Sequence, residues 1–515
     1  MTAVSSTDES AISSEDDGVL TEAAAAGCPH ALTALEAPFQ PPVGEEPMTT
    51  EGLPHPPRRL PFIGDMWGGS FARPTQDTVR MAKRHNLGPI FSRKIFGNEF
   101  VFVASPHLMA DVCDESRFAK FLFPGLRYMR PLAGDALFTA YHGEPSWQQA
   151  HNILMPAFTQ NSMHRYHDTM WNVASQMTRR WSSRARAGLS IDVVDDVTRL
   201  TLETIAQTGF GYTFHSFDSD EPHPFPAALA RSLRFAQMQG YEVPGAKSRL
   251  NRRAIRRNAA DIAYMHGEVD RVVQARIAEL EGGGTDEAPN DLLSLMLEEA
   301  DPATGQRLTA EQIRYQIVTF LGAGYETTSS SLGFALYFLL NNPDVFAKAR
   351  AEVDAVWGTD PDVQPTFEQI TKLRYVRRVF EESLRLWPTA PGFTRKALHD
   401  QTLGGYPIKK DQWIVVVLGL VHRDPVFGED TDTFDPDRFL PVNVRARPAQ
   451  AYKPFGTGER ACIGRQFAVH EAVMALGRVV ANFDLHDTYG YELKVKELLT
   501  QKPEGFRMTI TERQR

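Results

Sequence analysis

The surroundings of one cysteine constrain this chain more than any other feature of its sequence. Cys462 lies in the run FGTGERACIG (455–464), and a segment of helical character follows it. Gly456 and Gly458 can adopt the positive φ angles of a tight turn, and Gly464 lets a helix begin close to a flat group. A helix N-terminus behind the cysteine also stabilises its negatively charged form. The run therefore indicates a loop that holds a thiolate ligand for a haem iron.

The same glycines allow a second interpretation. Gly456-x-Gly458-x-x-Ala461 also matches a dinucleotide-binding fingerprint, in which the glycine loop joins a buried strand to a helix. That motif needs a hydrophobic strand immediately upstream, whereas residues 445–453 contain charges, proline and alanine. The context favours the thiolate interpretation.

The thiolate loop resembles the signature of a known family. Phe455-x-x-Gly458-x-Arg460-x-Cys462-x-Gly464 is similar, at every defined position, to the cysteine-ligand signature of the cytochrome P450 monooxygenases. The resemblance implies heme b with Cys462 as its axial thiolate. Because the sequence stops at Arg515, no flavin is expected in this chain. The resemblance also implies a mainly α fold with a small β region, in which a single large helical domain surrounds the haem.

The resemblance extends from about Leu60 to the C-terminus. In particular, the chain is similar to the haem domain of the bacterial self-sufficient fatty-acid hydroxylases, which is fused to a diflavin reductase. Four further runs carry this similarity: CDESRF (113–118), AHNIL (150–154), LRLWPTAP (384–391) and KPEGF (502–506). Since this sequence stops at Arg515, a separate electron donor is expected.

Charge divides the chain into two parts. Residues 1–50 contain nine acidic residues and no Lys or Arg, and since the whole chain has 55 basic and 64 acidic residues, the remainder is neutral. We expect residues 1–53 to form a disordered acidic extension and residues 54–515 to form one thiolate-haem monooxygenase domain. The neutral part lacks the basic groove of a nucleic-acid-binding protein.

Cysteine usage and hydropathy indicate the compartment. Cys28, Cys113 and Cys462 are too few and too scattered for a disulfide framework. No apolar run is long enough for a membrane span or a signal peptide. The sequence therefore predicts a soluble, cytoplasmic protein with Cys113 in its core. Cys28-Pro29 in the acidic extension leaves a haem-sensing site as an alternative.

The longest helical pattern is predicted from Thr309 to about Asn341, with Thr309 and Gln312 as a capping box. Such a helix can cross a large domain. Short strands are expected at 100–104, 413–420 and 508–511, in a small sheet beside a helical core. The run AGYETT (323–328) places small residues in the middle of the helix, so another group should approach that face or widen the hydrogen-bond ladder of the helix there.

In the resembled family this run crosses the distal face of the haem. The resemblance implies that Thr327 hydrogen-bonds dioxygen and that Glu326 relays protons. Each residue has a simpler alternative, because Thr327 could bond back to its own helix and Glu326 could be a solvated surface residue.

A pair of charges is expected to be structural. Glu382 and Arg385 are three residues apart and share one helical face. The run DPDRF (435–439) follows, and the resemblance implies a buried triad of Glu382, Arg385 and Arg438 that fixes the loop carrying Cys462.

The resemblance also assigns haem contacts and a substrate pocket. Trp147 and His151 share a helical face, although Trp147 could instead be a packed core indole. The residues implied to contact the haem are Lys120, Trp147, His151, Ala323, Phe455, Gly456 and Arg460. The residues implied to line an apolar substrate pocket are Ala133, Leu137, Phe138, Ala390 and Leu499.

Three stretches bear on substrate and partner. Where fatty-acid relatives hold a substrate carboxylate with Arg and Tyr, this chain has Asn98 and Phe102, which cannot form that ion pair. The basic run 247–257 is interpreted as a solvated helix face, with docking of an acyl carrier protein as the alternative. Lys453 and Arg465 would offer positive charge, on the Cys462 side, to a ferredoxin, a flavodoxin or a diflavin reductase.

Together these features predict a haem-thiolate monooxygenase. It would use O2 and two electrons to hydroxylate or epoxidise an apolar medium-to-long-chain substrate, such as a fatty acid or an acyl derivative. The alternative is a tailoring enzyme for a polyketide, terpenoid or carrier-bound intermediate. A peroxide-driven hydroxylase and a haem sensor are further alternatives, and the presence of both Glu326 and Thr327 counts against the peroxide-driven enzyme.

Overall fold

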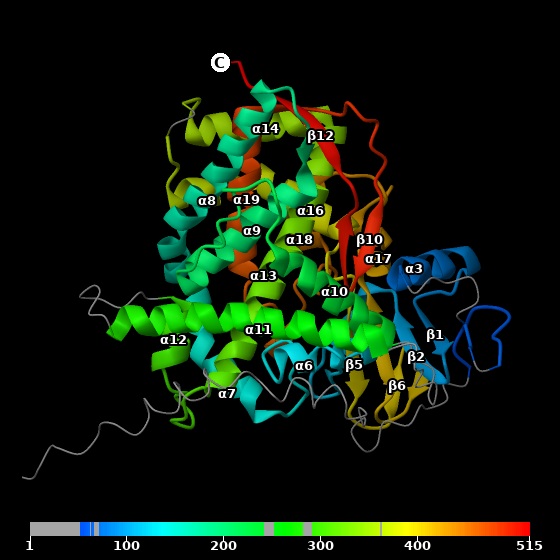
Figure 1. The fold of residues 1–515 in the computed structure, drawn as a ribbon. Coiled ribbons are helices and arrows are strands. Elements are labelled where there is room, and N and C mark those ends of the chain that lie inside the picture. Colours follow the sequence, from blue (N-terminus) through cyan, green and yellow to red (C-terminus); the bar gives the residue numbers. More distant parts are fainter. Residues whose placement is uncertain are drawn as a thin grey trace, which may run out of the picture.

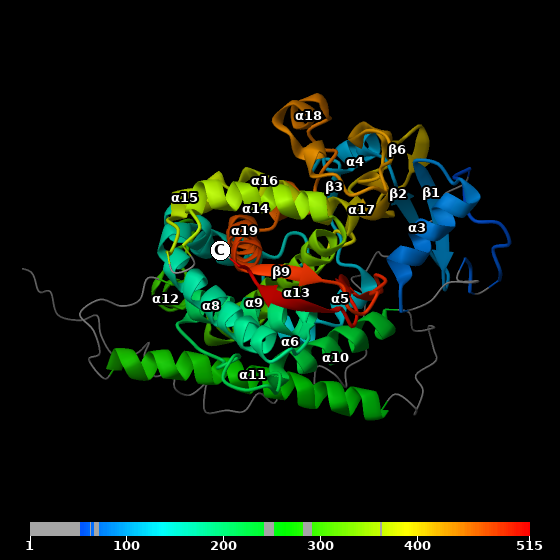
Figure 2. The ribbon, with the colours of Figure 1, turned by 90° about the horizontal axis from the view of Figure 1, so that it is seen from above.

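The computed structural model describes residues 52–61, 63–65, 72–240, 252–281, 291–360 and 363–514. Residues 1–51 of the expected acidic extension and residues 247–251 of the basic run lie outside the described residues. A helical body makes up most of the molecule, and a smaller sheet region lies at one side of it (Figures 1 and 2). The predicted fold class, mainly α with a small β region, is therefore confirmed.

Helix α13 (Ala310–Asn341) is the longest helix among the described residues, and it packs against α9 (Val193–Phe210), α16 (Arg374–Leu386) and α19 (Arg465–Asn482). The predicted capping box forms: Thr309 Oγ1 accepts from the Gln312 N–H at 3.2 Å, and Gln312 Oε1 accepts from the Thr309 N–H at 2.9 Å. Most side chains of α13 are buried, so the helix is part of the core.

The other helices surround α13 or flank the sheet. Many of them have proline in the first turn. Proline lacks a backbone N–H, and in the first turn that N–H would have no partner within the helix. The other helices are α3 (Pro74–His85), α4 (Pro106–Val112), α5 (Pro124–Arg127), α6 (Arg130–Ala133), α7 (Pro145–Leu154), α8 (Gln160–Arg186), α10 (Pro224–Gln239), α11 (Arg252–Glu281), α12 (Leu292–Glu298), α14 (Pro343–Trp357), α15 (Phe367–Lys372), α17 (Leu418–Val421) and α18 (Pro441–Ala446).

The largest described sheet has five strands in the order β1-β2-β8-β5-β3. Only the β2–β8 pair is parallel. Its strands come from both ends of the chain: β1 (Ile90–Ile95), β2 (Asn98–Val103), β3 (Phe118–Lys120), β5 (Gly392–Ala397) and β8 (Trp413–Val417). The sheet therefore joins the N-terminal segments to the segment that precedes the Cys462 loop.

Three smaller sheets complete the β region. A hairpin of β10 (Val495–Leu498) and β11 (Thr500–Pro503) packs against α13, and β4 (Ile191–Asp192), β12 (Arg507–Glu512) and β9 (Phe483–His486) form a three-stranded sheet. β6 (Gln401–Leu403) pairs with β7 (Tyr406–Ile408).

One strand prediction was wrong at its end. The strand expected at 413–420 stops at Val417, because residues 418–421 turn into α17. There the His422 N–H donates to the Leu418 carbonyl at 2.8 Å, which is a helical bond. The strands expected at 100–104 and 508–511 correspond to β2 and β12.

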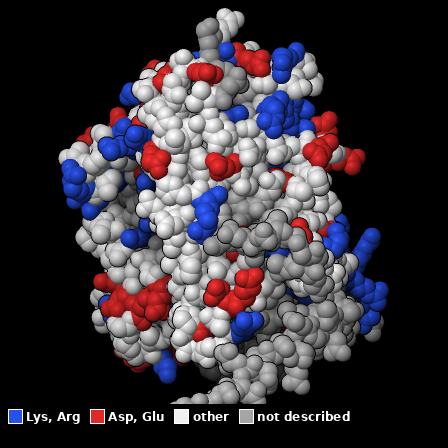
Figure 3. Space-filling view, turned by 90° about the vertical axis from the view of Figure 1, so that its left-hand side faces the viewer, with Lys and Arg blue, Asp and Glu red and all other residues white. Residues whose placement is uncertain are grey.

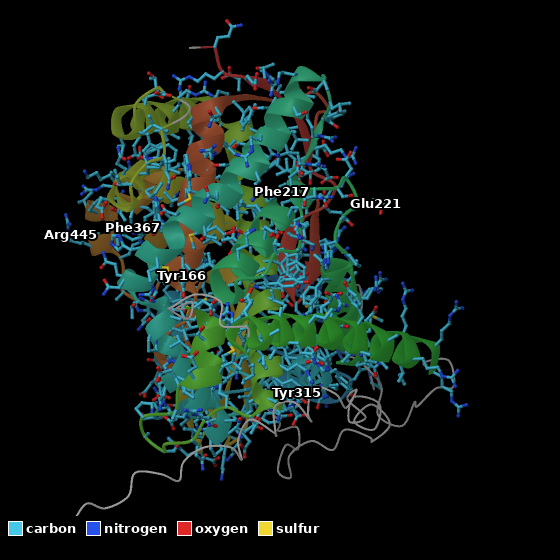
Figure 4. All side chains as sticks on the ribbon, turned by 60° about the vertical axis from the view of Figure 1, so that its left-hand side comes forward. Tyr166, Phe217, Glu221, Tyr315, Phe367 and Arg445 are labelled. Atoms are coloured by element: carbon cyan, nitrogen blue, oxygen red, sulfur yellow. The ribbon has the colours of Figure 1, made fainter. Side chains whose placement is uncertain are left out.

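The main hydrophobic core lies among α8, α9, α13, α16 and α19, and a second cluster lies against the five-stranded sheet. Tyr166 of α8 and Phe367 of α15 belong to the main core (Figure 4). Cys113, expected in the core, is half-buried against the second cluster. Among the described residues, no helix combines the length and the apolar character that crossing a membrane requires.

Candidate active site

The loop before α19 folds back on itself as its glycines require. Gly456 and Gly458 both have φ +72°. The Gly456 N–H donates to the Lys453 carbonyl at 3.0 Å, and the Cys462 N–H donates to the Phe455 carbonyl at 2.8 Å. The turn is therefore closed at both ends by backbone hydrogen bonds, and Cys462 lies just before the helix.

A side chain at Gly458 would also displace the Glu115 carboxylate. A Cβ atom at this position would lie 2.0 Å from Glu115 Oε1. The same carboxylate oxygen accepts from the Glu459 N–H at 3.1 Å, so Glu115 holds the loop from the segment after α4. This contact links two parts of the chain that are more than 300 residues apart, and it was not predicted from the sequence.

The Cys462 side chain is accessible, although protein atoms surround it closely. Burial raises the pKa of its thiol, while the Gly464 backbone N–H and the charge of Arg465 lower that pKa. These last two groups would stabilise a thiolate, and a bound cation would favour it further.

A second accessible face lies in the middle of α13. Ala323 is exposed there, although most of the helix is buried. Beside it, a Cβ at Gly322 would lie 3.1 Å from Leu229, and one at Gly324 would lie 3.0 Å from Ile205. As predicted, neighbouring groups approach the small residues closely, and they come from α9 and α10. Thr327 Oγ1 donates to the Ala323 carbonyl at 2.7 Å, so it bonds back to its own helix.

Glu326 is buried and not a solvated surface residue, so that alternative was wrong. Lys502 Nζ lies 3.1 Å from Glu326 Oε1 and 3.3 Å from Oε2. Thr500 Oγ1 also donates to Oε1, at 3.1 Å. Both partners come from β11, so the hairpin fixes this carboxylate beside Thr327.

Lys120, Arg395 and Arg460 lie together near the Cys462 loop, where Glu144, Glu459 and Glu115 offset part of their charge without forming an ion pair with them. Burial, followed by the charges of Arg460 and Arg395, lowers the pKa of Lys120 to about 7. Burial also lowers the pKa of Arg460 to about 10. No carboxylate of the described residues is within ion-pairing distance of Lys120, Arg395 or Arg460, and the buried Arg460 Nη1 has no partner among them.

Such a cluster needs negative charge, because buried unpaired cations are costly. The two propionates of a haem would supply it, and its iron would take the Cys462 thiolate. The residues present therefore fit this group. Arg395, in β5, is a cofactor-binding candidate that the sequence did not indicate, since nothing in the strand distinguishes it from the neighbouring Lys396.

Trp147 and His151 lie on one face of α7 as predicted. Their rings stack with centroids 4.7 Å apart. The Arg460 guanidinium lies over the Trp147 ring, 3.8 Å from its centroid, although Trp147 is only 6% exposed. Trp147 is thus both a packed indole and a support for Arg460. Phe455 is half-buried, and the Arg465 guanidinium lies 5.8 Å from its ring centroid.

Glu382, Arg385 and Arg438 form a buried charge cluster. Arg385 donates to both carboxylate oxygens of Glu382, at 2.6 and 2.7 Å, and Arg438 Nε lies 3.6 Å from Glu382 Oε1. Burial raises the pKa of Glu382, and Arg385 is the main group that opposes this rise. Arg385 and Arg438 also donate to backbone carbonyls between residues 422 and 433.

The side chains expected to line a substrate pocket differ in exposure. Phe138 is 50% exposed and Ala390 is exposed, whereas Leu137 and Leu499 are half-buried and Ala133 is buried. Side chains hold the backbone around Phe138: Gln316 accepts from the Leu137 N–H at 3.2 Å, and Lys120 donates to the Phe138 carbonyl at 2.6 Å. A polar Gln316 in the core is the sequence signal that could have indicated this contact.

Phe102, which the resemblance placed at a carboxylate-binding position, is buried in the sheet. It stacks on Phe91 with ring centroids 5.3 Å apart. Asn98, which begins β2, is half-buried and carries no charge. Neither residue offers a cation to a substrate carboxylate.

Comparisons with known proteins agree with this geometry. A sequence model of the cytochrome P450 family matches residues 54–510. A bifunctional cytochrome P450/NADPH–P450 reductase 2 of Bacillus subtilis is 46% identical over 83% of this chain and 40% of its own length. A bifunctional cytochrome P450/NADPH–P450 reductase of Bacillus cereus is 45% identical over 86% of this chain and 40% of its own length.

A fungal protein, a self-sufficient cytochrome P450 monooxygenase of Penicillium expansum, is 39% identical over 90% of this chain and 43% of its own length. The chain therefore spans about two fifths of the length of these relatives.

Proposed function

The chain belongs to the cytochrome P450 family, and from that premise we propose that it is a haem-thiolate monooxygenase. It uses O2 and two electrons to hydroxylate or epoxidise an apolar medium-to-long-chain substrate, such as a fatty acid or an acyl derivative. The observation that carries this proposal is the accessible Cys462 on its closed turn, beside three cations that have no ion-pair partner among the described residues.

Each residue of the site has a role in this proposal. Cys462 would supply the thiolate ligand of the iron, and Lys120, Arg395 and Arg460 would hold the propionates. When bound, the haem supplies dioxygen activation, which the electron-donating thiolate promotes. Trp147 and His151 support Arg460 from α7.

Thr327 and Glu326 handle protons. The Thr327 hydroxyl, which now donates to the Ala323 carbonyl, can rotate toward the accessible face of α13. Glu326 is fixed next to it by Lys502 and Thr500, so protons reach Thr327 through a carboxylate whose position the hairpin sets.

The substrate is apolar because the pocket candidates are apolar. Phe138, Leu137, Ala133, Ala390 and Leu499 present hydrocarbon groups and no charge. Asn98 and Phe102 cannot form an ion pair with a carboxylate, so a free fatty acid would be held mainly by its chain.

Electrons come from a flavin- or iron-sulfur-containing donor: a diflavin reductase, a flavodoxin or a ferredoxin. The names of the bacterial relatives record an NADPH–P450 reductase in the same chain. The donor docks on the Cys462 side, where Lys453 and Arg465 are positively charged.

Helix α18 projects from the body on its own (Figure 2), and Arg445 lies at the outer edge of the molecule (Figure 4). Figure 3 shows the molecule from the left-hand side of Figure 1, and this face carries both positive and negative charges.

The test is a titration of the haem-loaded protein with fatty acids, fatty alcohols and terpenoids, followed by turnover with a diflavin reductase under labelled dioxygen. The proposal expects acyl compounds to shift the spin state and one labelled oxygen to appear in the product. Turnover without labelled oxygen, or a response to terpenoids alone, would contradict it.

A further inference from the structure

We propose that His422 is a positioning residue for the thiolate loop: its ring accepts the N–H of Lys453 and so fixes the point at which the loop to Cys462 begins. This inference rests on the proposed function, since its purpose is to place an iron ligand. His422 lies outside the cysteine signature, and it also lies outside the charge cluster of Glu382, Arg385 and Arg438.

His422 follows α17 directly and is completely buried. Its Nε2 accepts from the Lys453 N–H at 3.3 Å. Its ring packs against Tyr452, with centroids 5.2 Å apart, and against Phe427 at 6.1 Å. The imidazole therefore contacts the two residues through which the chain enters the loop.

The protonation state of His422 suits an acceptor. Burial, followed by the charges of Arg385 and Arg423, lowers its pKa to about 3, so the ring is neutral at any working pH. Since Nε2 accepts, the ring proton is on Nδ1. Backbone carbonyls of Leu384 and Arg385 oppose this lowering of the pKa through hydrogen bonding, so polar groups surround the ring. A packed leucine could not supply the acceptor for the Lys453 N–H.

The contact joins two rigid parts of the protein. On one side, Arg385 donates to the His422 carbonyl at 3.0 Å, which ties this residue to α16 and Glu382. On the other side, the Lys453 carbonyl accepts from the Gly456 N–H and begins the turn that ends at Cys462. His422 thus transmits the position of the charge cluster to the loop through one side-chain hydrogen bond.

A second hydrogen bond anchors the chain at the start of the loop. Tyr452 Oη donates to the Glu381 carbonyl at 2.8 Å, so the neighbouring residue is held without His422. This makes a substitution of His422 informative, because the chain stays anchored at Tyr452 while the Lys453 amide loses its partner.

The experiment compares His422→Leu, which removes the acceptor, with His422→Gln, which keeps an acceptor near the position of Nε2. The first measurement is amide hydrogen exchange at Lys453 in the full-length protein. We expect exchange to be about tenfold faster in His422→Leu, the ratio that corresponds to one ordinary net hydrogen bond, and close to the wild-type rate in His422→Gln.

The second measurement is the CO spectrum of the reduced, haem-loaded variants, together with the reduction potential. We expect part of the red-shifted thiolate band to be lost in His422→Leu and restored in His422→Gln. Equal exchange rates and equal bands in wild type and His422→Leu would overturn the role of His422. If the wild type itself lacked the red-shifted band, the proposed function would fail instead, so the two failures are distinguishable.

Discussion

Glu326 and Lys502 form a buried ion pair that ties the middle of α13 to β11. Lys502 Nζ lies 3.1 Å from Glu326 Oε1. The Lys502 side chain is 18% exposed, and the Glu326 side chain is 6% exposed. The sequence predicted Glu326 as a proton relay but gave it no partner. The pair fixes where the carboxylate lies, so Lys502 should affect both stability and proton delivery.

The variant Lys502→Gln should lose stability and turn over more slowly. It leaves a buried carboxylate without its cation, which costs about 3 kcal/mol in the free energy of unfolding. Chemical denaturation measures this loss, and the solvent isotope effect on kcat reports proton transfer. The double variant Glu326→Gln/Lys502→Gln is the control. It should unfold at higher denaturant concentration than Lys502→Gln alone, and an additive loss would show that the pair is not coupled.

The contribution of Lys120 to haem binding should weaken as the pH rises above 7. In the haem-free protein the pKa of Lys120 is lowered to about 7, chiefly by burial, so the amine is increasingly neutral above that pH. A propionate beside it would raise the pKa again, and binding then requires uptake of a proton. Haem titrations between pH 6 and 9 measure this effect. In Lys120→Gln this part of the pH dependence should disappear, and an unchanged profile would remove Lys120 from the propionate site.

The substitution Gly458→Ala should disrupt the thiolate loop. Its φ of +72° and the 2.0 Å approach of Glu115 to a Cβ both oppose a side chain. Gly490 is a matched control, because it has φ +57° but nothing lies within 4 Å of its Cβ. Gly490→Ala should cost about 1 kcal/mol from its backbone alone, whereas Gly458→Ala should cost more and lose haem. The double variant Gly458→Ala/Glu115→Ala should recover part of this loss. Equal melting temperatures for the two glycine variants would argue against the contact.

Stability should also fall as the pH rises from about 5 to 8. Glu471 in α19 is buried, and burial raises its pKa to about 8. The Thr204 hydroxyl lowers this pKa only in part, and it also donates to the Leu200 carbonyl at 2.8 Å. The folded protein therefore keeps a proton that the unfolded chain releases near its ordinary pKa, so the folded state loses relative stability through this window.

The variant Glu471→Gln should lack this part of the pH dependence. Above pH 7 it should be more stable than the wild type by an amount on the order of 1–3 kcal/mol. Denaturation curves at several pH values measure it. If the free energy of unfolding changed with pH in the same way for the two proteins, Glu471 would be ionised in the folded state.

Local patterns explain what the sequence could predict. The helix from Thr309 and the turn around Gly456 and Gly458 follow from capping and backbone preferences within a few residues. The fold class followed from the resemblance that the Cys462 run carries.

The features that were missed depend on contacts between distant segments. Lys502 meets Glu326 across 176 residues, and Glu115 meets Glu459 across 344 residues. Arg395 lies in a strand with no pattern of its own, and it becomes a cofactor-binding candidate only when the fold places it near Lys120 and Arg460. Periodicity and spacing carry no information on such pairs.

The most direct test of the account is the CO-difference spectrum of the reduced, haem-loaded protein, measured for the wild type, Cys462→Ala and Cys113→Ala. The account predicts a red-shifted thiolate band in the wild type and in Cys113→Ala, and its loss in Cys462→Ala. A band that persists without Cys462, or that is absent from fully haem-loaded wild type, would contradict the assignment of Cys462 as the iron ligand.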